Sequence, residues 1–215
     1  MAVGSNLGDD IWVVDGTLDE IDFAGFSEDR FPLELALRAL SEFSRPGDRV
    51  FDPFGGLGTT LSAAEQLGRI GLAIEANPER AAYLKKTFGS PHVVLAGKIQ
   101  ELDLDDIPVC SLVLTSPPYL TVNLADDPWG YTYFDDMREI FARVAKRIRP
   151  DGRIIVEVSN VRSEDGFRPL VAEFQQALAP VLRMEHQIIR LNRSGAMAGP
   201  GVGWSSLLIW SPRGE

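Results

Sequence analysis

The sequence has little cysteine and histidine, the residue types that most often hold zinc-type metals or form covalent cross-links. Its 215 residues include one cysteine, Cys110, and two histidines, His92 and His186. A single cysteine has no partner for a disulfide within the chain, and three such residues far apart in sequence do not form a zinc-type ligand cluster. We therefore expect no metal site, and we expect Cys110 to be a small core residue.

Positive charge is also scarce. The chain has 21 Lys and Arg against 31 Asp and Glu, a formal net charge of −10. Proteins that grip duplex nucleic acid unaided neutralise its phosphates with basic side chains. The composition therefore argues against tight, unaided binding of duplex DNA.

Long apolar runs are absent, and no run approaches the roughly 18 residues of a membrane span. The first residues, MAVGSNLGDDIWVVDG, carry acids where a secretory signal would carry Lys or Arg. With 45% hydrophobic residues the chain has enough for one full core. These features predict a single cytoplasmic domain over residues 1–215, with no membrane association.

Strands and helices are predicted to alternate along the chain. Helices are expected at 31–43, 57–68, 77–89, 135–152 and 169–182, and strands at 49–53, 70–75, 92–97, 109–115, 153–159, 184–192 and 204–212. This alternation predicts an α/β fold of the Rossmann-like type, a seven-stranded, mostly parallel sheet with helices on both faces. Because no helix separates the last two strands, we expect them to pair antiparallel at one edge. Residues 1–30 are expected to be irregular.

A glycine-rich loop, FDPFGGLGTT (51–60), follows the first predicted strand and opens a helix. Ligands of open α/β sheets bind at this edge, and Gly55, Gly56 and Gly58 would let the backbone approach one closely. The loop lacks the lysine of a phosphate-binding loop, and Asp52 would repel a pyrophosphate. The loop therefore favours a cofactor with an amino or ammonium group.

An acid stands at the end of the next predicted strand, about seventeen residues after Gly58. A carboxylate at this place, here Glu75, accepts hydrogen bonds from the ribose hydroxyls of a bound nucleoside. Together with the glycine loop, Glu75 predicts a cofactor that contains a nucleoside.

The segment LTSPPYL (114–120) ends another predicted strand with two prolines and a tyrosine. Pro117 and Pro118 cannot continue a central strand, which must therefore end near Ser116. Taken alone, the segment is equally consistent with a turn or with a functional loop.

Three segments together, FDPFGGLGTT, AIEANPE and LTSPPYL, resemble the S-adenosylmethionine-dependent amino methyltransferases of DNA, the N4-cytosine and N6-adenine type. In that family the first cradles the methionine part of S-adenosyl-L-methionine, the acid of the second binds its ribose, and the third is the catalytic loop. DDIWVV and FPLELALRAL are similar to the family's segment that closes over the cofactor, and residues 1–30 would take part in this. In that family the helix of this segment usually begins with the motif H-P-x-x-K-P. In this sequence Phe31-Pro32 is followed by Leu-Glu-Leu.

The resemblance implies roles for individual residues. Cofactor binding is expected from Trp12, Phe31, Pro32, Asp52, Pro53, Phe54, Gly55, Gly56, Gly58, Thr59, Thr60, Glu75, Ala76, Lys98, Ile99 and Thr115, and catalysis from Ser116, Pro117, Pro118 and Tyr119.

The catalytic loop implies a chemistry of amine methylation. The Ser116 side chain and the Pro117 carbonyl would accept hydrogen bonds from the two amine hydrogens, and Tyr119 would stack on the base. Because serine is not a strong base, the proton is expected to pass to water. A serine at this position is commoner among the cytosine-N4 enzymes of the family, so cytosine N4 in DNA is the favoured acceptor.

The acceptor itself stays open, because both candidate recognition segments, 121–134 and 192–204, are too short for a target-recognition domain. Trp129, Tyr131 and Tyr133 could bind substrate or could equally pack the sheet edge. Three alternatives follow: a DNA methyltransferase with a recognition partner or as a homodimer, an N-methyltransferase of RNA, a free nucleoside or another small amine, and an inactive cofactor-binding subunit.

Overall fold

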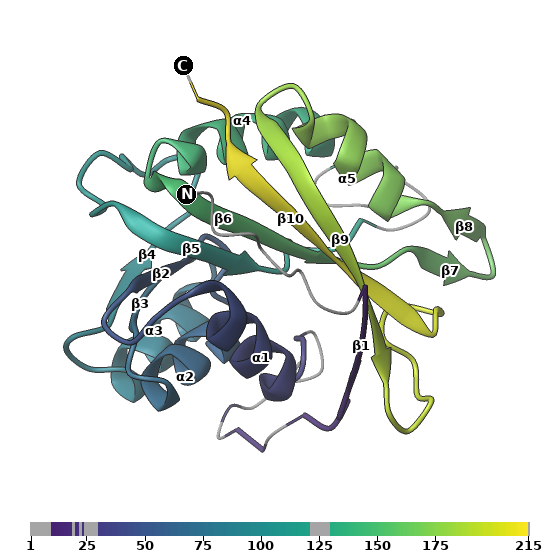
Figure 1. The fold of residues 1–215 in the computed structure, drawn as a ribbon, viewed down its shortest axis with the longest axis horizontal. Coiled ribbons are helices and arrows are strands. Elements are labelled where there is room, and N and C mark those ends of the chain that lie inside the picture. The colour runs from purple at the N-terminus through teal and green to yellow at the C-terminus, as the bar shows by residue number, and fades with distance from the viewer. Residues whose placement is uncertain (1–9, 19, 22, 24–29, 121–129, 215) are drawn as a thin grey trace, which may run out of the picture.

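A computed structural model of the chain describes residues 10–214 except 19, 22, 24–29 and 121–129 (Figure 1). Its centre is an eight-stranded sheet with the order β1-β9-β10-β6-β5-β2-β3-β4, and a two-stranded β7-β8 ribbon lies apart from it. The strands are β1 (Ile11–Val14), β2 (Arg49–Asp52), β3 (Ile70–Glu75), β4 (Val93–Ala96), β5 (Cys110–Thr115), β6 (Ile148–Val158), β7 (Val161–Ser163), β8 (Gly166–Arg168), β9 (Leu182–Asn192) and β10 (Trp204–Pro212).

Helices cover both faces of this sheet (Figure 1). They are α1 (Leu33–Phe43), α2 (Thr59–Gln66), α3 (Pro78–Thr87), α4 (Tyr133–Ala145) and α5 (Leu170–Leu178), with a short 3₁₀ helix, η2, at Gly130–Thr132. One core cluster joins α4 and α5 to the sheet, and a second joins α1 and α2 to the opposite face. The α/β fold with a mostly parallel sheet is therefore confirmed.

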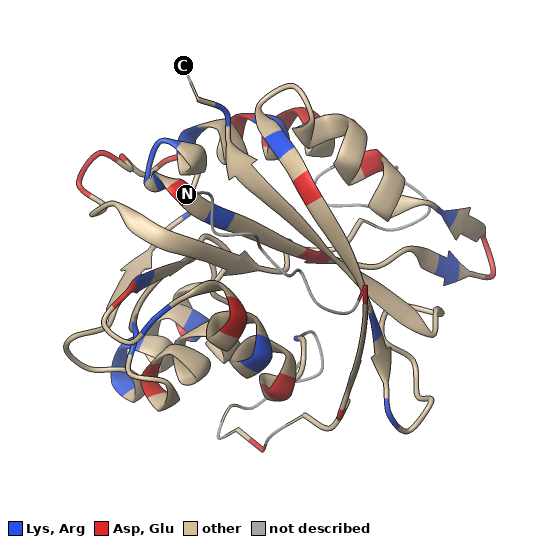
Figure 2. Ribbon diagram, viewed as in Figure 1, with Lys and Arg blue, Asp and Glu red and all other residues tan. Residues whose placement is uncertain are grey.

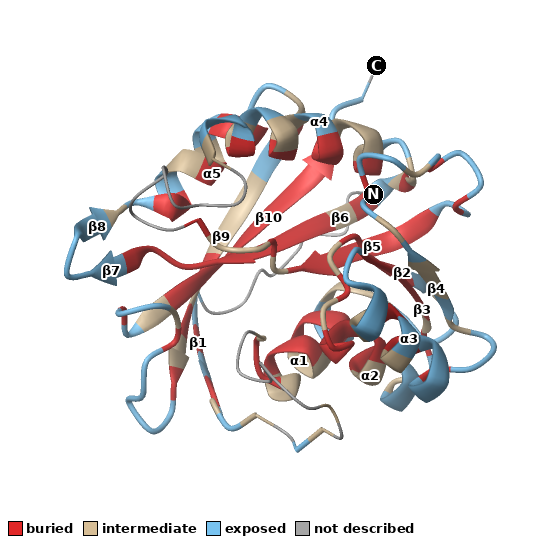
Figure 3. Cartoon of the chain, turned by 180° about the vertical axis from the view of Figure 1, so that it is seen from behind, coloured by how far each residue is buried: buried red, intermediate tan, exposed pale blue. Residues whose placement is uncertain are grey.

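The central strands are buried on both sides, as their sequences predict. All six residues of β5 are buried, and so are five of the six in β3. Figure 3 shows this burial as an almost continuous band through β2, β5, β6 and β10. Parallel strands covered on both faces need apolar residues at every position rather than an alternating pattern.

Two details of the predicted sheet are wrong. The sheet has eight strands rather than seven, because Ile11–Val14, expected to be irregular, pairs parallel with β9 as an edge strand. The last two strands, β9 and β10, do pair antiparallel, but β1 covers β9 and β10 lies between β6 and β9, so neither is the edge strand. Trp12 and Val14 point into the core while Ile11 and Val13 are exposed, the alternation of a strand covered on one face.

The helix expected over 135–152 is too long. It ends at Ala145, and β6 begins at Ile148. The apolar residues Met137, Ile140, Phe141 and Val144 do face the core as the helical period predicts, and Ile148 reaches the same cluster from the strand. Because all five residues are buried in one cluster, the apolar pattern of the helix continues in the sequence into the strand.

Helix α3 begins where its capping residues predict. The Asn77 side chain accepts hydrogen bonds from the backbone N–H groups of Glu79 and Arg80, and Pro78 is the first helical residue. This start fixes the chain direction just after Glu75, so the acid at the end of β3 is held against a rigid helix.

Acidic and basic side chains are interspersed over the helices and loops (Figure 2). Within the part of the chain that the structure describes, no helix is long and apolar enough to cross a membrane. The same residues contain no group of three or more His, Cys, Asp or Glu side chains placed to hold a metal ion. Cys110 is buried, as expected.

Candidate active site

A large cavity, about 1170 Å³, opens at the carboxyl ends of the central strands. Its wall takes residues from the loop after β2, from the end of β3, from the loop after β5 and from the ends of β6 and β9. Open α/β sheets bind their ligands at this edge. The cavity therefore lies where the glycine loop and the Pro-Pro loop were expected to meet.

Most of the predicted site residues line this cavity. Those brought together are Phe31, Pro32, Pro53, Phe54, Gly56, Glu75, Ala76, Lys98, Ile99, Ser116, Pro117, Pro118 and Tyr119. The others with an expected cofactor role, Trp12, Asp52, Gly55, Gly58, Thr59, Thr60 and Thr115, do not line it. Their contacts with the cofactor stay predictions.

The glycine loop is shaped by close backbone contacts. The Gly55 N–H donates to the Ile74 carbonyl at 2.7 Å, which draws the loop onto β3. Gly58 has a φ of +86°, and a Cβ there would lie 2.6 Å from the Phe88 ring. Only glycine fits both the left-handed backbone and the space. The loop can therefore pass from strand to helix while leaving Gly56 at the cavity wall.

Glu75 closes the other side of this loop. One carboxylate oxygen accepts the Gly56 N–H at 2.7 Å and the other accepts the Asn77 N–H at 2.7 Å. Each oxygen has a second lone pair, and the residue lines the cavity while only 8% exposed. A carboxylate fixed in this way fits a pair of ribose hydroxyls, so the residues present fit the nucleoside part of S-adenosyl-L-methionine.

Asp52 is buried below the glycine loop and is not presented to the cavity. Its carboxylate accepts hydrogen bonds from the Thr115 hydroxyl at 2.6 Å and from the Phe54 N–H at 3.1 Å. Burial, with a smaller contribution from the nearby Glu75 carboxylate, raises the pKa of Asp52 to about 6 despite these donors. The structure gives Asp52 the task of joining the ends of β2 and β5.

Trp12 likewise has a structural place. Its side chain is 2% exposed, and the Arg38 guanidinium lies 4.3 Å from the centre of its ring. As an inward-pointing residue of β1, Trp12 belongs to the core cluster under α1, and its contact with the cofactor stays a prediction.

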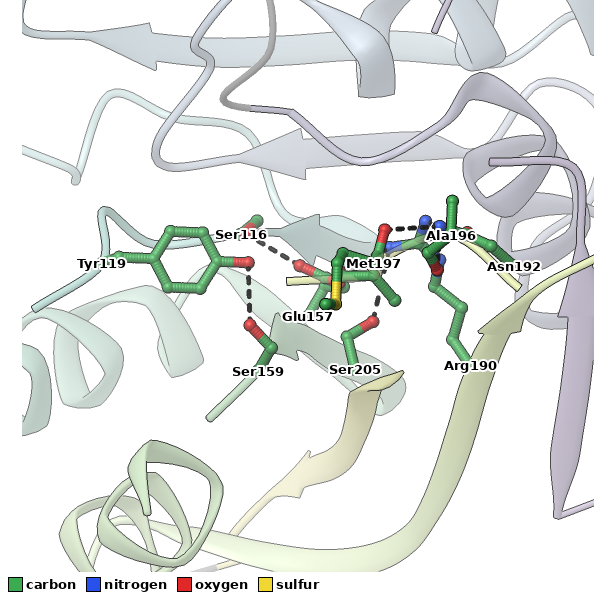
Figure 4. Close-up of polar contacts among 10 residues, drawn as sticks. Ser116, Tyr119, Glu157, Ser159, Arg190, Asn192, Ala196, Met197 and Ser205 are labelled. Carbon is green, nitrogen blue, oxygen red and sulfur yellow. Dashed lines mark hydrogen bonds and ion pairs between the residues drawn. The ribbon is translucent and has the colours of Figure 1, made fainter. Parts of the chain in front are cut away.

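The loop after β5 is held by hydrogen bonds on both sides. The Ser116 hydroxyl donates to the Glu157 carboxylate at 3.0 Å, and the Tyr119 hydroxyl accepts from Ser159 at 3.4 Å (Figure 4). Behind the loop, the Tyr133 hydroxyl donates to the Pro118 carbonyl at 2.7 Å. The loop therefore combines the stiffness of two prolines with three side-chain anchors.

The three aromatic residues suggested for substrate binding have different outcomes. Tyr133 is 1% exposed, packs edge-on against Phe134 and Phe174 and does not line the cavity, and its contact with substrate stays a prediction. Tyr131 is 82% exposed and does not line the cavity. Trp129 lies outside the described residues.

Sequence reasoning missed the polar group opposite Ser116. Glu157, Arg190 and Asn192 line the cavity, and the Arg190 guanidinium lies 3.5 Å from the Glu157 carboxylate. Burial raises the pKa of Glu157, while Arg190 and the hydroxyls of Ser205 and Ser116 oppose the shift. The signal was present in the sequence, because Glu157 interrupts the otherwise apolar run IIVEV (154–158) near the end of a buried strand.

Comparison with solved structures shows a shared fold at low identity. A chain from the complex between the *Haloferax volcanii* Trm112 methyltransferase activator and a putative methyltransferase matches with a TM-score of 0.63 and 16% identity, over 84% of this chain and 89% of that one. A TehB-like SAM-dependent methyltransferase from *Corynebacterium glutamicum* gives 0.57 and 15%, over 83% and 87%. Magnesium protoporphyrin IX methyltransferase from *Synechocystis*, solved with bound SAM, gives 0.55 and 12%, over 84% and 78%.

A family model matches the first part of the chain. Residues 10–86 match the family described as DNA methylase, of the N6 and N4 type. The matched range covers less than half of the chain. It contains the glycine loop and Glu75, and it ends before the loop that starts at Ser116.

Proposed function

We propose that the chain is a methyltransferase that transfers the methyl group of S-adenosyl-L-methionine to an exocyclic amine, with N4 of cytosine in DNA as the favoured acceptor. One observation carries the proposal: the SPPY loop lines the same cavity as the glycine loop and Glu75. A single cavity of about 1170 Å³ offers room for a nucleoside cofactor and a base together. The match to DNA methylases and the serine at position 116 support the choice of acceptor.

The cofactor supplies an activated methyl group, and the chain must place an amine in line with it. Two acceptors of the SPPY loop, the Ser116 hydroxyl and the Pro117 carbonyl, would each take a hydrogen bond from the amine. These bonds draw the nitrogen toward tetrahedral geometry and free its lone pair. The Pro-Pro sequence removes backbone freedom before substrate arrives, so the carbonyl needs little rearrangement.

Tyr119 would hold the acceptor base in plane. It lines the cavity beside Ser116, and stacking of a base on an aromatic ring contributes about 1–3 kcal/mol. Burial and the neighbouring Glu157 carboxylate raise the pKa of Tyr119, so the ring stays a neutral phenol. A neutral ring suits stacking on a base better than a phenolate would.

A second acceptor class is favoured by the charge of the chain. A net charge of −10 does not suit an enzyme that must grip duplex DNA by itself. RNA, a free nucleoside or another small amine is therefore the alternative acceptor, and a catalytically inactive, cofactor-binding subunit is a third role. The similar *Haloferax* chain comes from a complex with an activator protein, which supports a partner subunit for this chain too.

The acceptor can be found by following a labelled methyl group. The protein would be incubated with radiolabelled S-adenosyl-L-methionine and, in parallel, duplex DNA, single-stranded DNA, tRNA and a nucleoside panel. Label in N4-methylcytosine of either DNA would support the proposal. Label only in tRNA or nucleosides would sink the DNA assignment, and cofactor binding by calorimetry without label in any fraction would favour an inactive subunit.

A further inference from the structure

Glu157 is the buried acid on the acceptor side of the cavity. It stands one residue before the end of β6, it is 2% exposed, and it lines the cavity together with Ser116. Figure 4 shows its carboxylate between the Ser116 hydroxyl and the side chains of β9. A carboxylate in such a place costs several kcal/mol of desolvation unless it is paired, so its retention needs a reason.

The hydrogen bond from Ser116 fixes where that hydroxyl proton points. A serine hydroxyl has one proton and two lone pairs. Since its proton is donated to Glu157 at 3.0 Å, both lone pairs of Ser116 Oγ remain for the acceptor amine. A freely rotating hydroxyl could instead point its proton at the amine nitrogen and occupy the lone pair that must attack.

Arg190 keeps a charge partner next to this carboxylate. Its guanidinium is 3.5 Å from Glu157, and its side chain is 5% exposed. The same side chain donates to the Ala198 carbonyl at 3.1 Å and to the Asn192 side chain at 2.5 Å. The titratable groups that act on Glu157 are thus Arg190, which favours its ionised form, and Tyr119, which stays neutral.

We propose that Glu157 is the positioning residue of the acceptor site and the final proton acceptor of the reaction, acting through Ser116. This rests on the proposed amine methylation. The N–C bond forms as the S–C bond breaks, and that electron pair leaves with sulfur as the thioether. The methylated nitrogen then loses a proton to Ser116 Oγ while the Ser116 hydroxyl proton moves to Glu157. Water later receives the proton from Glu157, and the chain is restored.

This assignment replaces the expectation that the proton passes from the amine directly to water. The raised pKa of Glu157 makes its carboxylate a stronger base than an ordinary glutamate, which is the property a proton acceptor needs near neutral pH. The competing role is purely structural, in which the ion pair with Arg190 only anchors the loop at Ala198.

Single-turnover rates against pH separate the two roles. With labelled S-adenosyl-L-methionine and a single-stranded cytosine oligonucleotide, the wild-type rate should fall toward acid as Glu157 becomes protonated. Glu157→Gln keeps the shape of the side chain and an oxygen that can accept the hydrogen bond from the Ser116 hydroxyl. The amide cannot take the proton. We expect its rate to fall by about 100-fold or more, with the acid limb lost.

Ser205→Ala is the matched control, because Ser205 also hydrogen-bonds Glu157 but has no place in the proton path. Its acid limb should move to higher pH, with the plateau rate kept. A Glu157→Gln variant with the wild-type rate and acid limb would overturn the proposal. So would a loss of plateau rate in Ser205→Ala as large as that in Glu157→Gln.

A second measurement does not depend on turnover or on Glu157→Gln folding. In protein with ¹³C-labelled glutamate carboxyls, the Glu157 resonance is assigned as the one lost in Glu157→Gln, or in Glu157→Asp if the former does not fold. Ser116→Ala should raise its titration midpoint, since a donor to the carboxylate is lost. An unchanged midpoint would overturn the proposal. Absence of label with the wild type would count against the proposed function alone, because this titration still decides the coupling.

Discussion

The hydroxyl of Tyr133 donates a 2.7 Å hydrogen bond to the carbonyl oxygen of Pro118. Tyr133 belongs to the first turn of α4 and is buried, so a helix end and the SPPY loop are joined through one phenol. Neither proline of the loop has a backbone N–H to donate, and the loop therefore depends on its carbonyls for such ties. The position of the acceptor loop is set in part by a residue that does not line the cavity.

Removal of this hydroxyl should slow methyl transfer more than it destabilises the fold. In Tyr133→Phe the ring still fills its place between Phe134 and Phe174, and the hydrogen bond to Pro118 is lost. We expect a loss of about 1 kcal/mol in the free energy of unfolding, and a loss of kcat from the less constrained loop. Chemical denaturation and labelled-methyl transfer would measure the two effects.

Tyr131→Phe provides the control for this variant. Tyr131 is two residues away and 82% exposed, so the same chemical change there should leave both quantities as in the wild type. Equal kcat values for Tyr133→Phe and Tyr131→Phe would contradict a positioning role for the Pro118 bond.

The glycine loop should tolerate a side chain poorly at Gly58. Both Gly58 and Gly68 have positive φ, +86° and +68°, so alanine costs backbone strain of about 1 kcal/mol at either position. At Gly58 the new Cβ would also lie 2.6 Å from Phe88 and 2.7 Å from Leu84, both buried, whereas nothing lies within 4 Å at Gly68. Gly58→Ala should therefore lose about 1–3 kcal/mol more than Gly68→Ala.

Urea denaturation of the two variants tests this difference, because backbone strain is common to both and largely cancels. Equal midpoints would show that Phe88 and Leu84 yield without cost. The Gly58 variant should in addition bind S-adenosyl-L-methionine more weakly, since the loop it distorts carries Gly56 at the cavity wall.

The glycine loop, Glu75 and the SPPY loop could be placed from sequence because each depends on local rules. Gly58 is required by a left-handed backbone, Asn77 caps a helix through its own neighbours, and Pro117 ends a strand by lacking an N–H. Such features depend on a few neighbouring residues, so the local sequence is enough to predict them. The parallel arrangement of the central strands follows from the alternation with helices.

The partners of these residues could not be predicted, because they come from strands distant in sequence. Ser116 and Glu157 are 41 positions apart in the sequence. Arg190, on β9, reaches Glu157, on β6, across the intervening strand β10. The pairing of β1 with β9 could not be predicted either, because the four residues of β1 carry too short a pattern to indicate a strand.

Asp52 predicts a pH dependence of stability with an unusual sign. Its pKa in the folded protein is about 6, above the ordinary value of 3.8, so the folded state binds more protons than the unfolded state between these values. The free energy of unfolding should therefore fall as pH rises from about 4 to about 6, by about 3 kcal/mol from this group, and then level off.

Asp52→Asn should remove this slope. Its amide oxygen can still accept from the Thr115 hydroxyl and the Phe54 N–H, and it has no charge to bury. The free energy of unfolding of the variant minus that of the wild type should rise from pH 4 to 6 and stay constant above. Parallel curves for the two proteins over this range would contradict a raised pKa for Asp52.

Glu75 gives the most direct test of cofactor binding. Both of its carboxylate oxygens accept backbone N–H groups, from Gly56 and from Asn77, while the residue faces the cavity. Glu75→Gln replaces one acceptor with an NH₂ group that would oppose an N–H donor, and it also leaves one acceptor fewer for the ribose hydroxyls. We expect the Kd for S-adenosyl-L-methionine to rise about 10- to 100-fold, equivalent to about 1.4–2.7 kcal/mol.

Glu79→Gln makes the same change of charge on the exposed first turn of α3, and it should bind the cofactor as the wild type does. Titration calorimetry of the two variants would measure both constants. A Kd raised equally in both variants would show that the effect of Glu75 is one of overall charge and not of its fixed carboxylate.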